Sequence, residues 1–151
     1  MYKRTASSTT LLKASGAYFV LVFGAGFILG IFRTLFLVPR LGVRNAELLE
    51  MPVMLVVIFV SAKWIVQRFN LRSFGRQLIV GLIALTLMIG IEFSVVLKLR
   101  GLSLADYFEQ RDPISGAAYF VMLVVFATMP RVVRLLEERS QRASRYRALR
   151  S

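Results

Sequence analysis

Four apolar stretches, separated by polar connections, dominate the pattern of hydrophobic and polar positions along the chain. They cover about 16–38, 51–66, 78–97 and 113–129. A helix of roughly 35 Å would form over the first stretch, whereas the hydrocarbon core of a bilayer is about 30 Å thick. The pattern therefore predicts an all-α fold, a polytopic membrane four-helix bundle.

The polar segments outside these stretches set the expected organisation. We expect a cytoplasmic N-terminus over 1–15, a four-helix transmembrane domain over 16–134 and a basic cytoplasmic tail over 135–151. Between the third and fourth stretches, Ser103 to Asp106 has the form of a capping box, which predicts a short interfacial helix. Pro130 should kink or end the fourth helix, and the basic tail can continue as a helix beyond it.

Charge changes this picture by giving the membrane helices a direction. The chain has 20 Lys and Arg against 8 Asp and Glu, a net charge of +12. Because the basic residues lie between and after the apolar stretches, we assign them to anionic lipid head groups and not to nucleic acid. The residues assigned to head groups are Arg68, Arg72, Arg76, Arg131 and Arg134. Most basic residues fall on the side of the two termini, which predicts an N-in and C-in orientation.

The chain contains no Cys and no His. Thiolate chemistry, the usual His-ligated haem and zinc sites and histidine proton relays are therefore excluded. We expect neither a metal nor a cofactor.

Two charged residues interrupt the apolar stretches and form the candidate intramembrane polar cluster. Arg33 lies near the end of the first stretch and Glu92 near the end of the third. Since a cation within a membrane helix needs a partner, and both residues would lie at similar depth, we predict an ion pair between them. Glu47 and Glu50, which enter the second helix from the same side, could supply further acceptors. The pair is interpreted first as a structural clamp, with a ligand site or ion path as the alternative.

Small residues define a candidate packing seam on the first helix. Gly26 and Gly30 are four residues apart and share a helical face with Arg33. Such pairs let membrane helices approach closely. On the expected outer side, an acidic set follows the third stretch, formed by Asp106, Glu109 and Asp112.

A longer polar pattern carries a family resemblance. Residues 42–54, together with Ala62-Lys63-Trp64 and Arg111-Asp112-Pro113, resemble small uncharacterised proteobacterial inner-membrane proteins with four spans. The coinciding polar and proline positions are Arg44, Glu47, Glu50, Pro52 and Asp112. The resemblance implies a location in a bacterial inner membrane and brings no activity with it.

These observations favour a non-catalytic membrane protein, an accessory or scaffold subunit that packs into a homo-oligomer or a larger membrane complex. The alternative is a small oligomeric transporter or channel that binds a solute or proton at the Arg and Glu cluster. In a third, enzymatic interpretation, Glu47, Glu50 or Glu92 acts as a general base on a lipid-soluble substrate, but no second catalytic group is evident. The expected partners are membrane lipids, including anionic head groups, and not nucleic acid.

Overall fold

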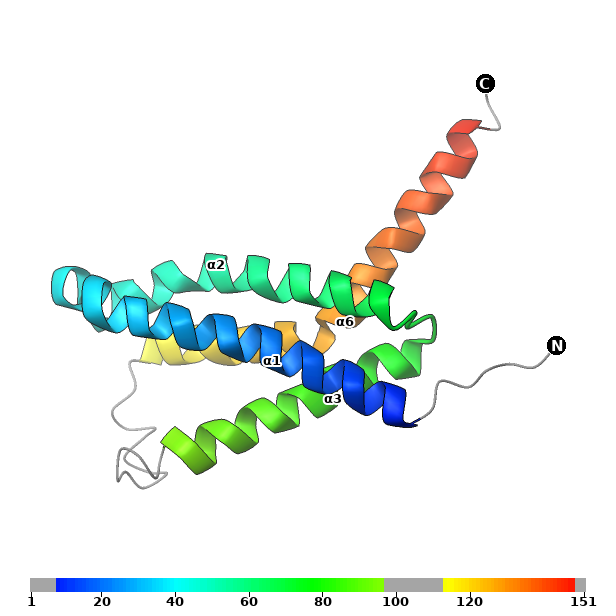
Figure 1. The fold of residues 1–151 in the computed structure, drawn as a ribbon. Helices are drawn as coiled ribbons and strands as arrows, with labels where there is room; N and C mark the ends of the chain where they lie inside the picture. Colours follow the sequence, from blue (N-terminus) through cyan, green and yellow to red (C-terminus); the bar gives the residue numbers. More distant parts are fainter. Residues whose placement is uncertain (1–7, 97–112, 149–151) are drawn as a thin grey trace.

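The structure is a computed structural model that describes residues 8–96 and 113–148, and all its described elements are helical (Figure 1). In chain order they are α1 (Ser8–Phe32), the π-helical turn η1 (Arg33–Leu37), α2 (Val38–Arg68), α3 (Phe74–Ile91), the π-helical turn η2 (Glu92–Val96) and α6 (Pro113–Ala148). Three helical stretches are long and apolar enough to cross a membrane: Ser8–Arg68, Phe74–Ser94 and Pro113–Arg145. The all-α prediction is confirmed.

A sharp reversal divides the first of these stretches into two arms. Gly42 has φ 74° and ψ 165°, which are not helical values. Figure 1 shows the chain turning back at this end, so that α1 and the rest of α2 lie side by side. Glycine suits the position because a side chain is strained at positive φ. Gly42 therefore makes residues 8–68 a helical hairpin.

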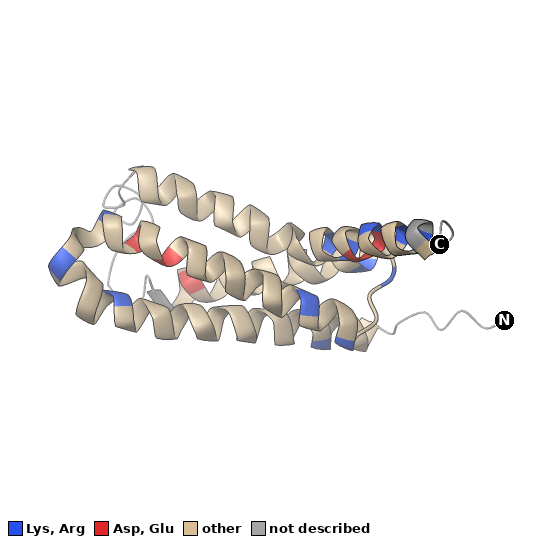
Figure 2. Ribbon diagram, turned by 90° about the horizontal axis from the view of Figure 1, so that it is seen from above, with Lys and Arg blue, Asp and Glu red and all other residues tan. Residues whose placement is uncertain are grey.

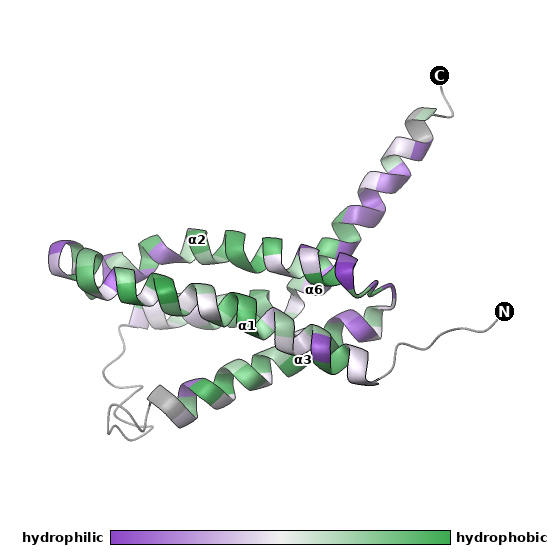
Figure 3. Ribbon diagram, in the orientation of Figure 1, coloured by the Kyte–Doolittle hydropathy of each residue, from purple (hydrophilic) through white to green (hydrophobic). Residues whose placement is uncertain are grey.

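The helices pack in the ring order α1, α2, α6 and α3, each against its two neighbours in the ring. Their shared core is formed by apolar side chains from all four helices and from the α2–α3 connection. The largest of the fully buried apolar and aromatic residues are Tyr18, Phe126, Ile65, Leu71, Val22, Val80 and Val133. Figure 3 shows that the ring is mainly hydrophobic and that polar residues concentrate at its ends and along the tail. Large apolar side chains also cover the outside of the ring, as a lipid-facing surface requires.

The second helix begins earlier than the sequence pattern indicated. We expected a polar connection up to the start of an apolar stretch at residue 51, whereas α2 starts at Val38 and carries Pro52 within it. Asn45 donates a hydrogen bond from Nδ2 to the Leu41 carbonyl, at 3.1 Å. The polar segment that we expected to be a connection is therefore mostly helical and forms part of α2, because the chain reverses at the single non-helical residue Gly42.

The fourth helix continues through Pro130 to Ala148. Figure 1 shows its first part within the ring and its last part, the tail helix of residues 131–148, bent away from it. The start of α1, the end of α2, the start of α3 and the tail helix all lie at the same end of the ring (Figure 1). The predicted interfacial helix and the acidic residues Asp106, Glu109 and Asp112 fall outside the described residues.

Candidate functional site

The clearest charged cluster lies inside the hairpin, where η1 faces α2. Nη1 of Arg33 is 3.1 Å from Oε2 of Glu50 and 3.7 Å from Oε1 of Glu47. The side chains of Arg33, Glu47 and Glu50 are 29%, 19% and 13% exposed. Oε2 of Glu50 is buried and has no aligned hydrogen-bond donor among the described residues. The cluster is thus held by charge attraction between partly buried groups more than by hydrogen-bond geometry.

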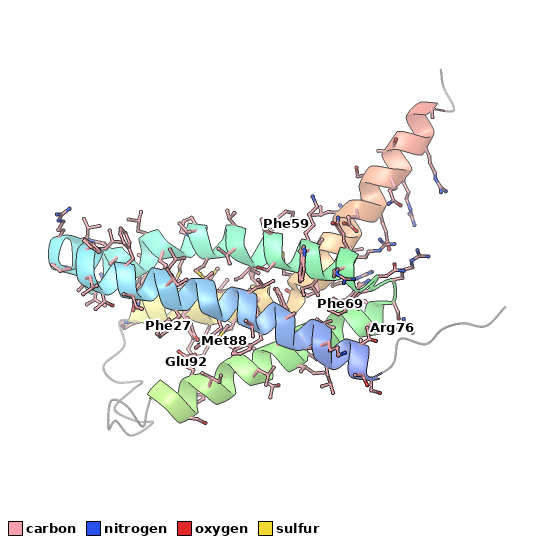
Figure 4. The ribbon with its side chains drawn as sticks, viewed as in Figure 1. Phe27, Phe59, Phe69, Arg76, Met88 and Glu92 are labelled. Atoms are coloured by element: carbon pink, nitrogen blue, oxygen red, sulfur yellow. The ribbon has the colours of Figure 1, made fainter. Side chains whose placement is uncertain are left out.

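Glu92 does not join this cluster, so the predicted ion pair with Arg33 is not formed in the described part of the chain. Glu92 instead accepts a hydrogen bond from the hydroxyl group of Tyr119 on α6. Figure 4 places Glu92 at the end of α3, on the side of the ring away from α2. The reason is local: Arg33 and Glu50 lie at nearly equal sequence distances on either side of Gly42, so the reversal places them at one level.

The two glycines of the predicted seam have different surroundings. A Cβ added to Gly26 would lie 3.3 Å from Cε of Met54, so this glycine faces α2 within the same chain. A Cβ added to Gly30 would have no neighbouring atom within 4 Å among those considered. Gly26 therefore helps to close the hairpin, whereas Gly30 leaves open space on α1.

The bend in α6 is bound to α1 by a buried hydrogen bond. Pro130 has no backbone N–H, so the carbonyl of Phe126, four residues earlier, lacks its usual helical donor. The Tyr18 hydroxyl group donates to this carbonyl at 2.9 Å, and the rings of Tyr18 and Phe126 stack with centroids 4.6 Å apart. A side chain on α1 thus replaces the hydrogen bond that proline removes from α6.

Close contact with α3 supports the same bend. A Cβ added to Gly81 would overlap the backbone carbonyl of Ala127. Only a residue without a side chain fits at this crossing of α3 and α6. No sequence pattern distinguishes Gly81 from the other glycines, whereas Pro130 indicates that the Phe126 carbonyl needs another donor.

Polar contacts also tie together the end of the ring where the tail begins. Gln77 is fully buried; its Nε2 donates to the Leu71 carbonyl at 2.7 Å, and its Oε1 accepts a hydrogen bond from Arg131 at 3.3 Å. The Arg131 guanidinium group also lies 5.0 Å from the centre of the Phe74 ring. This network joins α6 to the connection between α2 and α3.

Of the basic residues assigned to lipid head groups, three contact other side chains within the described ranges of the chain, namely Arg72, Arg131 and Arg134. Arg131 makes the contacts above, and Arg134 pairs with Glu137 and Glu138 at 3.4 and 3.2 Å. Arg72 donates to Asn70 at 2.8 Å, whereas Arg68 and Arg76 have exposed or partly exposed side chains at this end of the ring. Figure 2 shows charged residues gathered near the two ends and along the tail helix. Contact of these residues with head groups stays a prediction.

Within residues 8–96 and 113–148, no group of three or more Asp and Glu side chains is placed so that it could hold a metal ion. Comparisons of the chain with models of protein families, with curated proteins and with solved structures found no match. The resemblance to proteobacterial inner-membrane proteins therefore stays a prediction. The helices themselves define the class: a small, all-helical integral membrane protein.

Proposed function

We propose that this chain is a non-catalytic integral membrane protein whose helices cross the membrane four times, and that it serves as an accessory or scaffold subunit. Each arm of the hairpin counts as one crossing, followed by α3 and by the first part of α6. The end that carries both the start of α1 and the tail helix faces the cytoplasm of a bacterial cell, since it holds most of the basic residues.

One observation carries the proposal: the polar side chains within the apolar helices engage other parts of the same chain. Arg33 engages α2, Glu92 engages α6, and the Tyr18 hydroxyl group engages a backbone carbonyl of α6. Such contacts fix the register of helices and do not converge on one point where a substrate would react. A rigid bundle with an apolar outer surface suits a role in assembly.

Gly30 offers the test of assembly, because a side chain added there would meet open space and no neighbouring described helix of the same chain. Tagged and untagged copies would be expressed together, extracted in native nanodiscs and captured through the tag. We expect Gly30→Leu to lower recovery of the untagged copy or of a larger complex, since the added side chain blocks close helix approach. Gly90→Leu, which fills another open glycine position on α3, is the matched control.

Equal recovery for the original protein and both variants would contradict the assembly surface at Gly30. Recovery of the tagged chain alone, as a single copy per nanodisc, would contradict the subunit role as a whole. Gly26→Leu is unsuitable for this purpose, because Gly26 contacts Met54 and the change would disturb the hairpin itself.

The alternative function, a small oligomeric transporter or channel, is favoured by the partial exposure of Arg33 beside the buried Glu50 oxygen. A solute or proton reaching this cluster would compete with the Arg33 contact. Flux measured in proteoliposomes distinguishes the two functions: transport requires a flux that Glu50→Gln abolishes, whereas the scaffold role predicts no flux above empty vesicles.

A further inference from the structure

The tail helix has the dimensions and position of a membrane-surface element. Residues 131–148 would extend about 27 Å along a helix axis. Figure 1 shows that they leave the ring at its basic end and are bent away from the direction of the first part of α6. A straight helix would have continued along the ring axis, whereas the part of α6 that follows Pro130 runs obliquely to that axis (Figure 1).

The basic residues of this helix differ in what they contact. Arg131 and Arg134, near its start, are engaged by Gln77, Glu137 and Glu138. The later residues Arg139, Arg142 and Arg145 are exposed and form no ion pair or hydrogen bond among the described residues. The cations open to an external anion are therefore on the last turns, beyond the residues that the sequence pattern singled out.

An apolar strip precedes these arginines. Val132, Leu135 and Leu136 are spaced so that they share one face of the helix, and they are 40%, 37% and 49% exposed. Val133, at the next position round the helix, is 1% exposed because it packs into the ring. By its spacing Arg139 falls on the same side of the helix as the exposed strip, so one side of the tail helix presents apolar side chains followed by a cation.

We propose that the tail helix lies on the surface of the anionic leaflet of the same membrane. Val132, Leu135 and Leu136 enter the boundary between head groups and acyl chains, and Arg139, Arg142 and Arg145 contact lipid phosphates. This inference rests on the proposed four-crossing topology, which puts the basic end at the cytoplasmic surface. A soluble acidic partner or nucleic acid would account for the arginines but not for the adjoining apolar strip beside the bilayer.

The test uses fluorescence from single cysteines, which the cysteine-free chain allows without removing any native residue. Leu136→Cys carries an environment-sensitive NBD probe on the strip, and Val20→Cys carries one on the lipid-facing side of α1, where Val20 is 61% exposed. Both proteins are placed in nanodiscs of phosphatidylcholine alone or with phosphatidylglycerol at a ratio of about 7:3, chosen to give an anionic surface. We expect the Leu136 probe to shift to shorter wavelengths only in the anionic discs.

Removing the three tail cations by Arg139→Gln, Arg142→Gln and Arg145→Gln should reverse that shift. At the usual contribution per arginine, the ratio of surface-bound to free tail should fall roughly a hundredfold. A matched control removes three charges elsewhere, by Lys13→Gln, Arg40→Gln and Lys63→Gln, and should leave the shift unchanged. High salt should weaken it as the triple change does.

Three results would overturn the inference: equal Leu136 emission in neutral and anionic discs, no effect of the triple tail change, or a response only when soluble polyglutamate or RNA is added. The Val20 probe separates this failure from failure of the topology. Emission typical of lipid at Val20 with an aqueous signal at Leu136 contradicts the surface tail alone. An aqueous signal at Val20 contradicts the membrane crossing of α1.

Discussion

Replacing Tyr18 by Phe removes one hydroxyl group and leaves the stacked ring in place. The lost hydrogen bond is the 2.9 Å contact with the Phe126 carbonyl, which has no backbone donor because residue 130 is proline. A buried carbonyl left unsatisfied costs about 1–3 kcal/mol, and hydrogen bonds between membrane helices average about 0.6 kcal/mol with a maximum near 1.7. Since water does not reach a fully buried Tyr18, we expect a loss of about 1.5 kcal/mol in the free energy of unfolding.

A double-mutant cycle with Pro130→Ala tests this mechanism directly. Alanine restores an N–H that can donate to the Phe126 carbonyl, so Tyr18→Phe should cost at least 1 kcal/mol less in that background, by our estimate of the lost contact. Unfolding of the detergent-purified protein in SDS, followed by circular dichroism, provides the free energies. The matched control is Thr128→Val, which removes a 2.8 Å hydroxyl contact to the Val124 carbonyl on α6.

That carbonyl keeps its helical donor, so the Thr128 change should cost less than about 0.5 kcal/mol. The reasoning would be refuted by equal costs of Tyr18→Phe in the Pro130→Ala background and in the original protein. Such a result would mean that Tyr18 contributes packing alone.

Two further predictions concern the glycines of α3 and the charged cluster. Gly81→Ala should lower the free energy of unfolding by about 1–3 kcal/mol, because the new methyl group overlaps the Ala127 carbonyl. The control Gly90→Ala should be neutral or stabilise the helix by up to about 1 kcal/mol. Equal effects of the two changes on SDS unfolding would contradict the close crossing of α3 and α6. In a double-mutant cycle, Arg33→Gln and Glu50→Gln should show a coupling free energy of about 1 kcal/mol. The unfolding costs of Arg33→Gln and Glu92→Gln should be additive, because Glu92 binds Tyr119. Coupling of Arg33 to Glu92 and not to Glu50 would contradict the observed cluster.

The apolar pattern was a sound guide to the helices because membrane burial imposes long apolar stretches whatever the packing. It predicted an all-helical chain and a helix that could continue beyond Pro130, both of which are confirmed. The sequence pattern put Glu92 first as the partner of Arg33 and named Glu47 and Glu50 only as further acceptors, because depth alone does not say which neighbouring helix an arginine faces. That choice depends on the reversal at Gly42, which places Glu47 and Glu50 opposite Arg33.

The contacts missed from the sequence share a physical cause. Tyr18 and Gly81 meet backbone carbonyls of α6, and Gln77 donates to the Leu71 carbonyl in the preceding connection. The need of a particular carbonyl for such a neighbour cannot be read from the type of its own residue. The contact at Phe126 is the exception, because a proline at position 130 predicts that the Phe126 carbonyl lacks its helical donor and needs another one.

The direction of the tail helix follows from these internal contacts. Tyr18 from α1 and Gly81 from α3 meet α6 within one turn of Pro130, and Arg131 binds Gln77 directly after it. The bend is therefore fixed by three separate parts of the ring and not by proline alone. Because the direction of the tail helix is already fixed, less conformational entropy is lost when this helix binds a surface. If Tyr18 sets this angle, Tyr18→Phe should also reduce the membrane-surface signal of the Leu136 probe in anionic nanodiscs. An unchanged signal would show that Gly81 and Gln77 hold the bend without it.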